Sequence, residues 1–289
     1  MCSETHSAGI RPLGLTIPNV VRNRHSSEIH GSRPGISAGR GGTFAFSLIE
    51  LLVVVAIIAI LAGLLLPALN LAKHKGKTAG CLNQLKQFAA AAQMYSGDNS
   101  GFLVANSTTT GTNGWVGGNM KVDNQATNTT LVRQGKLFPY SGRTEMFHCP
   151  ADVSTTATGS LRTRSYSMNS WIGSRVMESV STAALGFRTF VREVEFATGS
   201  PATLWLMADE HEATIEDGFF LVTMDDSQPF ASFPALRHQH GFGLNFVDGH
   251  AELWKLRDPT TTLGSRTGPQ ITGKNSDWLR LKQETTIPQ

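Results

Sequence analysis

Residues 46–66 of this 289-residue chain form a predominantly apolar stretch in which Glu50 is the one charged side chain. As an α-helix, the stretch would span about 31 Å at roughly 1.5 Å per residue, close to the hydrocarbon thickness of a bilayer. It is longer than the core of an ordinary secretory signal, which has about 7–15 residues. The sequence therefore predicts a membrane-spanning helix, and the fold must give that helix an apolar environment.

Glu50 needs a physical explanation, because a carboxylate at the centre of a membrane helix costs about 2.5–3.5 kcal/mol. It follows Phe46 by four residues and so lies near one end of the stretch. One interpretation is an interfacial side chain near the helix start, where the helix dipole favours an anion. The other is that a positive charge lies beside Glu50 in the apolar environment.

The segments on either side of the apolar stretch differ in composition. Residues 1–45 are rich in Gly, Ser, Arg and Pro and have no apolar period, which is typical of a disordered leader peptide. Pro67 follows the stretch, and we expect it to kink the helix or to end it locally. Residues 67–100 place apolar side chains at three- and four-residue steps, which predicts an amphipathic continuation of the helix that ends near residues 98–101.

Residues 101–258 are predicted to form a globular α+β domain. After a segment rich in Thr, Asn and Gly, four runs have strand character. These runs are 185–196, 203–209, 218–224 and 244–256. In the last run, Asp248-Gly249 separates two alternating segments, which is a strong hairpin signal. We expect an antiparallel sheet packed on the second half of the long helix, and a polar C-terminal tail over residues 259–289 with one short segment around 278–281.

The charge distribution argues against a nucleic-acid partner. The formal net charge is +3, and the whole excess lies in residues 1–45, where five Arg face Glu4 and Glu28. Residues 46–289 hold 20 basic and 20 acidic side chains. A body without net charge lacks the basic footprint that binds phosphates.

The run FSLIELL at residues 46–52, followed by the apolar stretch, resembles the prepilin-type N-terminal cleavage and methylation signature of type IV pilins and type II secretion pseudopilins. The resemblance implies that a membrane prepilin peptidase cuts between Ala45 and Phe46 and that the new Phe46 amine is methylated. It also implies a pilin-like fold, with Pro67 where the family often has proline. Glu50 would then pair with the terminal amine of a neighbouring subunit, and loss of one partner from such a buried pair costs about 3–5 kcal/mol.

This resemblance implies a bacterial inner-membrane protein with a single span and its C-terminal domain outside the cytoplasm, or in an extracellular filament. Its partners would be the peptidase and methylase, the membrane and other pilin-like subunits. Its function would be structural and not enzymatic, as a subunit or minor component of a type IV pilus or type II secretion pseudopilus. The alternative is a membrane-tethered binding or metal-dependent hydrolytic module that acts on surface polysaccharide and uses the pilin export route.

A second resemblance lies nearer the C-terminus. His238, nine residues and then Asp248-Gly249 are similar to the H-X9-DG motif of a large group of prepilin-like exported proteins. The segments that also resemble that group are 81–101, 147–152 and 164–169. This second resemblance implies an architecture more than an activity.

Three histidines and an aspartate gather at this motif, and two interpretations remain open. The residues are His238, His240, Asp248 and His250. In one interpretation, the hairpin brings Asp248 and His250 near the His-X-His segment, and the histidines bind Zn²⁺ or a similar divalent ion. In the other, which we favour and which needs no cofactor, Asp248 and Gly249 serve the turn while His238 hydrogen-bonds the hairpin backbone.

Two other groups of residues were candidates for chemistry. Residues 209–212, with the sequence DEHE, we interpret as a solvated strand end, and they lack the spacing of a calcium loop. Cys81 and Cys149 are the cysteines left once Cys2 is lost with the leader. In an oxidising compartment we expect these two to form a disulfide; otherwise both are buried thiols. Outside the predicted leader, residues 1–45, no nucleophile elbow, phosphate loop or His-Glu-X-X-His sequence is present.

Overall fold

The computed structural model describes residues 47–107, 113–179, 186–225, 231–261 and 275–289. The chain divides into two compact units, residues 1–54 and 55–289. Of the first unit, the structure describes the start of one helix, and the remaining description concerns the second unit. The predicted leader and the predicted cleavage site at Ala45 and Phe46 lie outside the described residues.

One helix, α1 (Leu48–Asp98), contains both the apolar stretch and its amphipathic continuation. Pro67 lies inside it, so the proline does not end the helix. A capping box closes the first turn: the Ser47 amide donates to Glu50 Oε2 at 2.8 Å, and the Glu50 amide donates to Ser47 Oγ at 3.2 Å. Beyond Asp98, Ser100 and Gly101 have φ values of 56° and 76°, a left-handed pair that reverses the chain and confirms the predicted helix end.

The apolar half of α1 has its large side chains exposed. Leu48 is 81% exposed and Leu64 is 74% exposed, and the pattern continues as far as Leu71. By length and composition, α1 is a helix that can cross a membrane. The structure therefore agrees with the sequence on one long apolar helix near the N-terminus.

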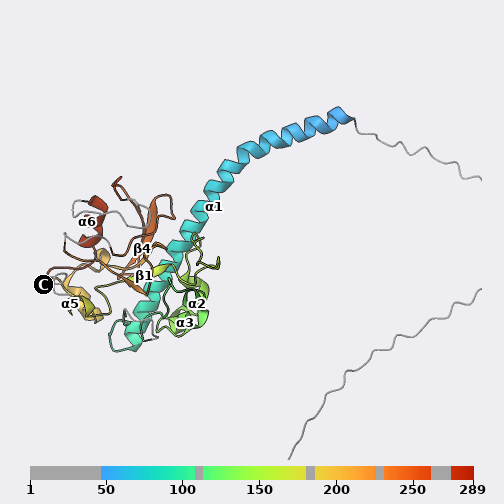
Figure 1. Ribbon diagram of the computed structural model, residues 1–289. Coiled ribbons are helices and arrows are strands. Elements are labelled where there is room, and N and C mark those ends of the chain that lie inside the picture. The colour runs from blue at the N-terminus through green and yellow to red at the C-terminus, as the bar shows by residue number, and fades with distance from the viewer. Residues whose placement is uncertain (1–46, 108–112, 180–185, 226–230, 262–274) are drawn as a thin grey trace, which may run out of the picture. The chain divides into compact units, whose positions relative to one another are not determined.

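The second half of α1 packs on the domain through one face (Figure 1). Cys81, Leu85, Phe88 and Ala89 are buried on it, at the spacing of a single helix face. Two side-chain amides also join α1 to the sheet: Asn245 Nδ2 donates to the Leu85 carbonyl of α1 at 2.6 Å, and Gln93 Nε2 of α1 donates to the Val247 carbonyl at 3.2 Å. The predicted amphipathic continuation is confirmed.

The domain is built on a five-stranded sheet with the order β3-β1-β2-β4-β5. The strands are β1 (Tyr166–Asn169), β2 (Trp205–Asp209), β3 (Phe219–Phe220), β4 (Gly241–Phe246) and β5 (Ala251–Lys255). Three neighbouring pairs are antiparallel, but β1 and β3 are parallel. The α+β class is confirmed, whereas a purely antiparallel sheet was wrong. After β2 the chain returns across β1 to its far edge, so β3 runs in the same direction as β1.

The strands predicted from the sequence were confirmed only in part. Run 203–209 gives β2, and run 244–256 gives β4 and β5 joined at Asp248-Gly249, so the hairpin is confirmed. Run 218–224 gives only the two residues of β3. The strand predicted at residues 185–196 was wrong, because the described part of this run ends in the 3₁₀ helix η2 (Glu193–Thr198). Glu195 accepts from the Val191 and Arg192 amides and closes a helical turn there.

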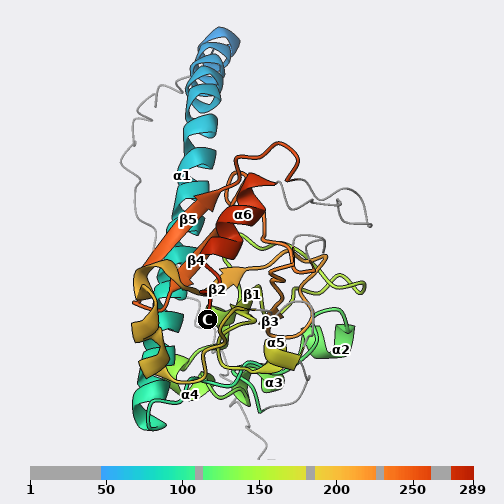
Figure 2. The same ribbon diagram turned by 90° about the vertical axis from the view of Figure 1, so that its left-hand side faces the viewer.

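The two faces of the sheet carry different partners (Figure 2). On β4, Gly243 and Asn245 face α1, while Phe242, Leu244 and Phe246 belong to a core cluster on the opposite side. That cluster includes Trp278 and Leu281 of α6 (Ser276–Gln283). The C-terminal segment is therefore not the polar tail predicted, because α6 buries an apolar face in the core.

Short helices complete the fold. They are α2 (Asp123–Ala126), α3 (Thr129–Arg133), α4 (Phe138–Ser141), η1 (Thr144–Phe147), α5 (Val176–Ser179) and η3 (Pro201–Thr203). Of these, η1 ends two residues before Cys149, a fully buried member of the core.

Candidate metal centre

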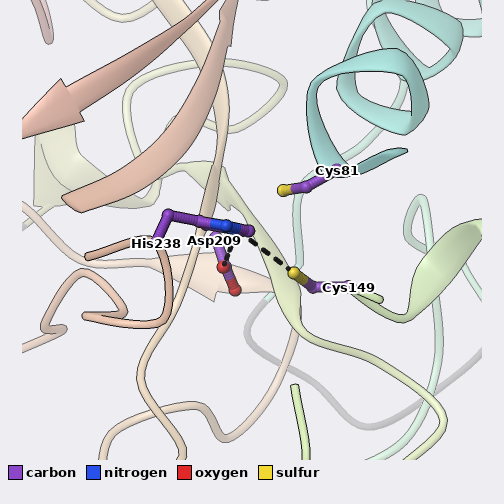
Figure 3. A group of neighbouring side chains, drawn as sticks. All are labelled: Cys81, Cys149, Asp209 and His238. Carbon is purple, nitrogen blue, oxygen red and sulfur yellow. Dashed lines mark hydrogen bonds and ion pairs between the residues drawn. The ribbon is translucent and has the colours of Figure 1, made fainter. Parts of the chain in front are cut away.

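Four buried side chains converge where α1 meets the sheet: Cys81, Cys149, Asp209 and His238 (Figure 3). One ligand atom from each lies within 4.8 Å of the others. Cys81 comes from α1, Cys149 from the segment after η1, and Asp209 from the end of β2. His238 comes from the turn before β4. Four distant segments thus contribute two sulfur atoms, one carboxylate and one imidazole.

The turn before β4 directs the imidazole of His238 inward. The His238 amide donates to the Gly241 carbonyl at 3.1 Å, which closes the turn. Gln239 and His240 both have positive φ values, 54° and 59°, and their side chains are exposed. A left-handed pair of non-glycine residues reverses the chain sharply. His238 is consequently buried while its neighbours face solvent.

The hydrogen bonds of His238 define which ring nitrogen faces the cluster. Nδ1 lies 3.0 Å from Thr78 Oγ1, and the Thr78 hydroxyl donates to the His74 carbonyl at 3.0 Å. Because that hydroxyl has a single proton, Nδ1 of His238 is the donor in their contact. Nε2 therefore faces Cys149 Sγ at 3.4 Å and Asp209 Oδ2 at 3.6 Å. The prediction that the His238 side chain hydrogen-bonds the hairpin backbone was wrong, because its ring nitrogens contact Thr78, Cys149 and Asp209.

Asp209 has two oxygens in different situations. Oδ1 accepts from Arg237, which also contacts Asp152 at 3.1 Å and Glu212 at 2.9 Å. Oδ2 is fully buried and has no hydrogen-bond donor among the described residues. A buried carboxylate oxygen without a donor costs free energy unless a charge or an ion lies beside it. Here the nearest cationic group is the imidazole of His238.

The protonation of the cluster follows from its burial and from the contacts among its members. Burial alone would lower the pKa of His238, but its contacts with Asp209 and Cys149 outweigh that effect and raise the pKa to about 9. The pKa of the Cys149 thiol is raised by its hydrogen bond with Cys81, by burial and by the Asp209 charge. In the absence of an ion, the centre is therefore a charged imidazole beside a carboxylate and a neutral thiol.

Both cysteines are free thiols in the structure. This corresponds to the second of the two expectations for them, buried thiols, and not to the disulfide. The Tyr166 hydroxyl lies 3.3 Å from Cys81 Sγ and 2.8 Å from Gln84 Oε1, so α1 is also bound to β1 beside the cluster.

The three histidines of the C-terminal motif do not converge. Among the described residues, His238 joins the buried group, but His240 and His250 do not. His250 instead stacks on the Phe246 ring at 4.1 Å between centroids, and its Nδ1 lies 2.5 Å from Asp248 Oδ1. Gly249 has a φ of 100°, so Asp248-Gly249 serves the turn as predicted. The ligand set His238, His240 and His250 is therefore corrected to His238 with residues from other elements.

The acidic run at residues 209–212 also requires correction. Asp209 and Glu210 are buried, whereas the sequence predicted a solvated strand end. Asp209 is held by Arg237, and Glu210 is so fully buried that desolvation raises its pKa to about 7. Asp209 is thus a candidate ligand that the sequence analysis placed on the surface. The apolar run WLMA directly before it, at residues 205–208, was the available signal.

The arrangement can hold a metal ion, because thiolate, imidazole and carboxylate are all metal ligands and their atoms lie close together. Comparison with known proteins finds no matching family model, no similar curated protein and no similar solved structure. We therefore infer the function from the residues and their arrangement.

Proposed function

We propose that this chain is a structural subunit or minor component of a filament of the type IV pilus or type II secretion pseudopilus kind. In this proposal a prepilin peptidase removes residues 1–45 at the inner membrane, Phe46 is methylated, and the mature chain assembles with other pilin-like subunits. The domain then lies outside the cytoplasm. The observation that carries the proposal is a lone carboxylate, Glu50, in the first turns of an apolar helix whose large side chains are exposed.

The exposed apolar side chains of α1 need a partner. Full burial of one Leu, Ile or Val side chain is worth about 1.5–3 kcal/mol, and α1 exposes many of them between Leu48 and Leu71. A bilayer provides such an environment, and so does a bundle of identical helices. The second half of α1 uses a separate set of side chains for the domain core, so both requirements are compatible in one helix.

The capping box gives Glu50 one role within its own chain. Its carboxylate accepts the Ser47 amide, which serves the helix start whether or not the chain assembles. Assembly would add a second role, as the partner of a neighbouring terminal amine. The first role needs a hydrogen-bond acceptor, whereas the second needs a negative charge, so the two can be separated by substitution.

The rival proposal, a hydrolytic module, gains little from the candidate metal centre. Catalytic zinc sites keep one coordination position open for water or substrate, whereas structural sites are closed. Here the four side chains are buried and all of them are available as protein ligands. The centre therefore supports a structural role for the domain.

The test compares Glu50→Gln with Ser47→Ala in cells that carry the assembly machinery. Glutamine keeps the acceptor of the capping box but removes the charge. We expect Glu50→Gln to reach the membrane at normal levels and to lose most filament assembly, measured in sheared surface fractions and by electron microscopy. Ser47→Ala weakens the cap by about 0.5–2 kcal/mol and keeps the charge, so it should still assemble.

Normal filaments from Glu50→Gln would contradict the proposal, because the carboxylate would then act only as a cap. Equal loss in both variants would also contradict it, since helix capping would explain the loss without any charge pair. Membrane levels of each variant, measured by immunoblot, provide the control for expression.

A further inference from the structure

We propose that Cys81, Cys149, Asp209 and His238 bind one Zn²⁺ ion, and that this ion fastens α1 to the sheet domain. The proposal does not depend on filament assembly. It rests on the ligand chemistry, on the spacing of the ligand atoms and on the contacts that orient them.

The separations from His238 Nε2 fit a tetrahedral zinc site, and all four ligand atoms lie within 4.8 Å of one another. With Zn–S distances of about 2.3 Å and Zn–N or Zn–O distances of about 2.0–2.2 Å, neighbouring ligand atoms lie about 3.4–3.8 Å apart. His238 Nε2 lies 3.4 Å from Cys149 Sγ and 3.6 Å from Asp209 Oδ2. These are the separations of ligands that share an ion, and the second exceeds the length of an ordinary hydrogen bond.

Three of the four ligands also have an outer contact that orients them. The Thr78 hydroxyl fixes Nδ1 of His238 as a donor, which leaves Nε2 for the ion. Arg237 occupies Oδ1 of Asp209 and leaves Oδ2 without a donor in the described part of the chain. The Tyr166 hydroxyl reaches Cys81 Sγ. Hydrogen-bonding partners of this kind commonly orient the ligands of zinc sites.

The charges are compatible with a divalent ion. On binding, each thiol releases one proton to solvent, and any imidazolium proton on Nε2 leaves as well. Two thiolates and one carboxylate then surround Zn²⁺, while the neutral imidazole completes the set. The resulting single negative charge lies beside Arg237, which is already in contact with Asp209.

The ion would join elements that are far apart in the sequence. Cys81 lies on α1, whereas the other three ligands belong to the domain. Because the site is closed and buried, we assign it a structural role. The ion would fix the position of α1 on the domain by directional bonds, which the non-directional apolar contacts of the core do not provide.

The experiment uses the full-length chain in detergent, stripped of metal with a chelator under reducing conditions and then given Zn²⁺ or Co²⁺. We expect about one Zn²⁺ per chain by elemental analysis, and the cobalt form to show the intense visible bands of tetrahedral thiolate coordination. Cys149→Ser and Asp209→Asn should lose the ion, and Thr78→Val should weaken binding about 10- to 100-fold. His250→Ala is the matched control and should bind normally.

Circular dichroism of each variant shows whether it folds, and Asp209→Asn keeps the shape of the side chain if Cys149→Ser does not fold. Absence of zinc from the folded, reduced wild-type protein would overturn the proposal. So would loss of zinc in His250→Ala equal to that in Cys149→Ser. Recovery of a metal-free Cys81–Cys149 disulfide from native membranes would also overturn it, in favour of an oxidised pair at the same place.

Discussion

Arg237 contacts three carboxylates near the candidate metal centre, two of which, Asp152 and Asp209, are buried. Its guanidinium contacts Asp152, Asp209 and Glu212, and its side chain is only 10% exposed. Burial disfavours a charged group, yet the surrounding carboxylates raise the pKa of Arg237 above its usual value. At the residue scale, this one side chain therefore balances the charge that surrounds the ligand Asp209.

Substitution of Arg237 should be among the most destabilising changes of charge in the domain. In Arg237→Met, Asp152 and Asp209 lose their cation while they remain buried, and breaking a buried pair in this way costs about 3–5 kcal/mol. Chemical unfolding followed by tryptophan fluorescence measures the loss. Arg175→Ala is the control, because the Arg175–Glu178 pair is exposed and worth less than about 1 kcal/mol.

A free energy of unfolding for Arg237→Met that lies within about 1 kcal/mol of that for Arg175→Ala would contradict the proposed role of Arg237 in balancing the buried carboxylates. It would mean that the carboxylates near Arg237 are protonated or hydrated without it.

At the element scale, the contact between α1 and β4 depends on a glycine. A Cβ atom at Gly243 would lie 2.7 Å from Leu85 Cδ1 and 3.1 Å from Cys81 Sγ. The helix thus approaches the sheet so closely that a larger residue on β4 at this position would force the Leu85 side chain to shift. Asn245, two residues further on the same face, then reaches the Leu85 carbonyl.

Gly243→Ala should therefore destabilise the domain by about 1–3 kcal/mol through overpacking. Gly76→Ala is the matched control on α1, since nothing lies within 4 Å of its added Cβ, and it should stabilise the helix by roughly 0.5–1 kcal/mol. Thermal unfolding of both variants measures the difference. Similar melting temperatures for the two would show that α1 does not pack on β4 at Gly243.

Local patterns in the sequence predicted the elements they directly encode. The length of the apolar stretch and the helical period after it predicted α1, and Asp248-Gly249 predicted the hairpin of β4 and β5. The strand β1 was not predicted: its side chains alternate between apolar and polar, but the strand has only four residues and all of them are buried. The strand prediction failed at residues 185–196, where Glu195 caps a helical turn instead of lying on a strand.

The candidate metal centre was beyond such patterns, because its parts meet only through the tertiary fold. Cys149 and His238 are 89 residues apart, and Tyr166 and Cys81 are 85 residues apart. The sequence suggested metal ligands among histidines that are close along the chain, but the turn at Gln239 and His240 separates His238 from its neighbours. His238 was named as a candidate metal ligand, the two cysteines were predicted as a disulfide or as buried thiols, and Asp209 was placed in solvent.

At the scale of the whole molecule, one helix serves two environments. Its second half belongs to the domain core and to the candidate metal centre, and its apolar half is available for lipid or for other helices. Glu50 is the single acidic residue in that apolar half, so the proposed function depends on the positive charge it meets. In the proposed function, cleavage before Phe46 would create such a charge.

The most direct test is the intact mass of the protein isolated from the membranes of its native host. Our account predicts a chain that begins at Phe46, lacks residues 1–45 and carries one added methyl group. A chain that retains residues 1–45, or one trimmed after Leu66, would contradict it, because no terminal amine would then exist within the apolar bundle to pair with Glu50.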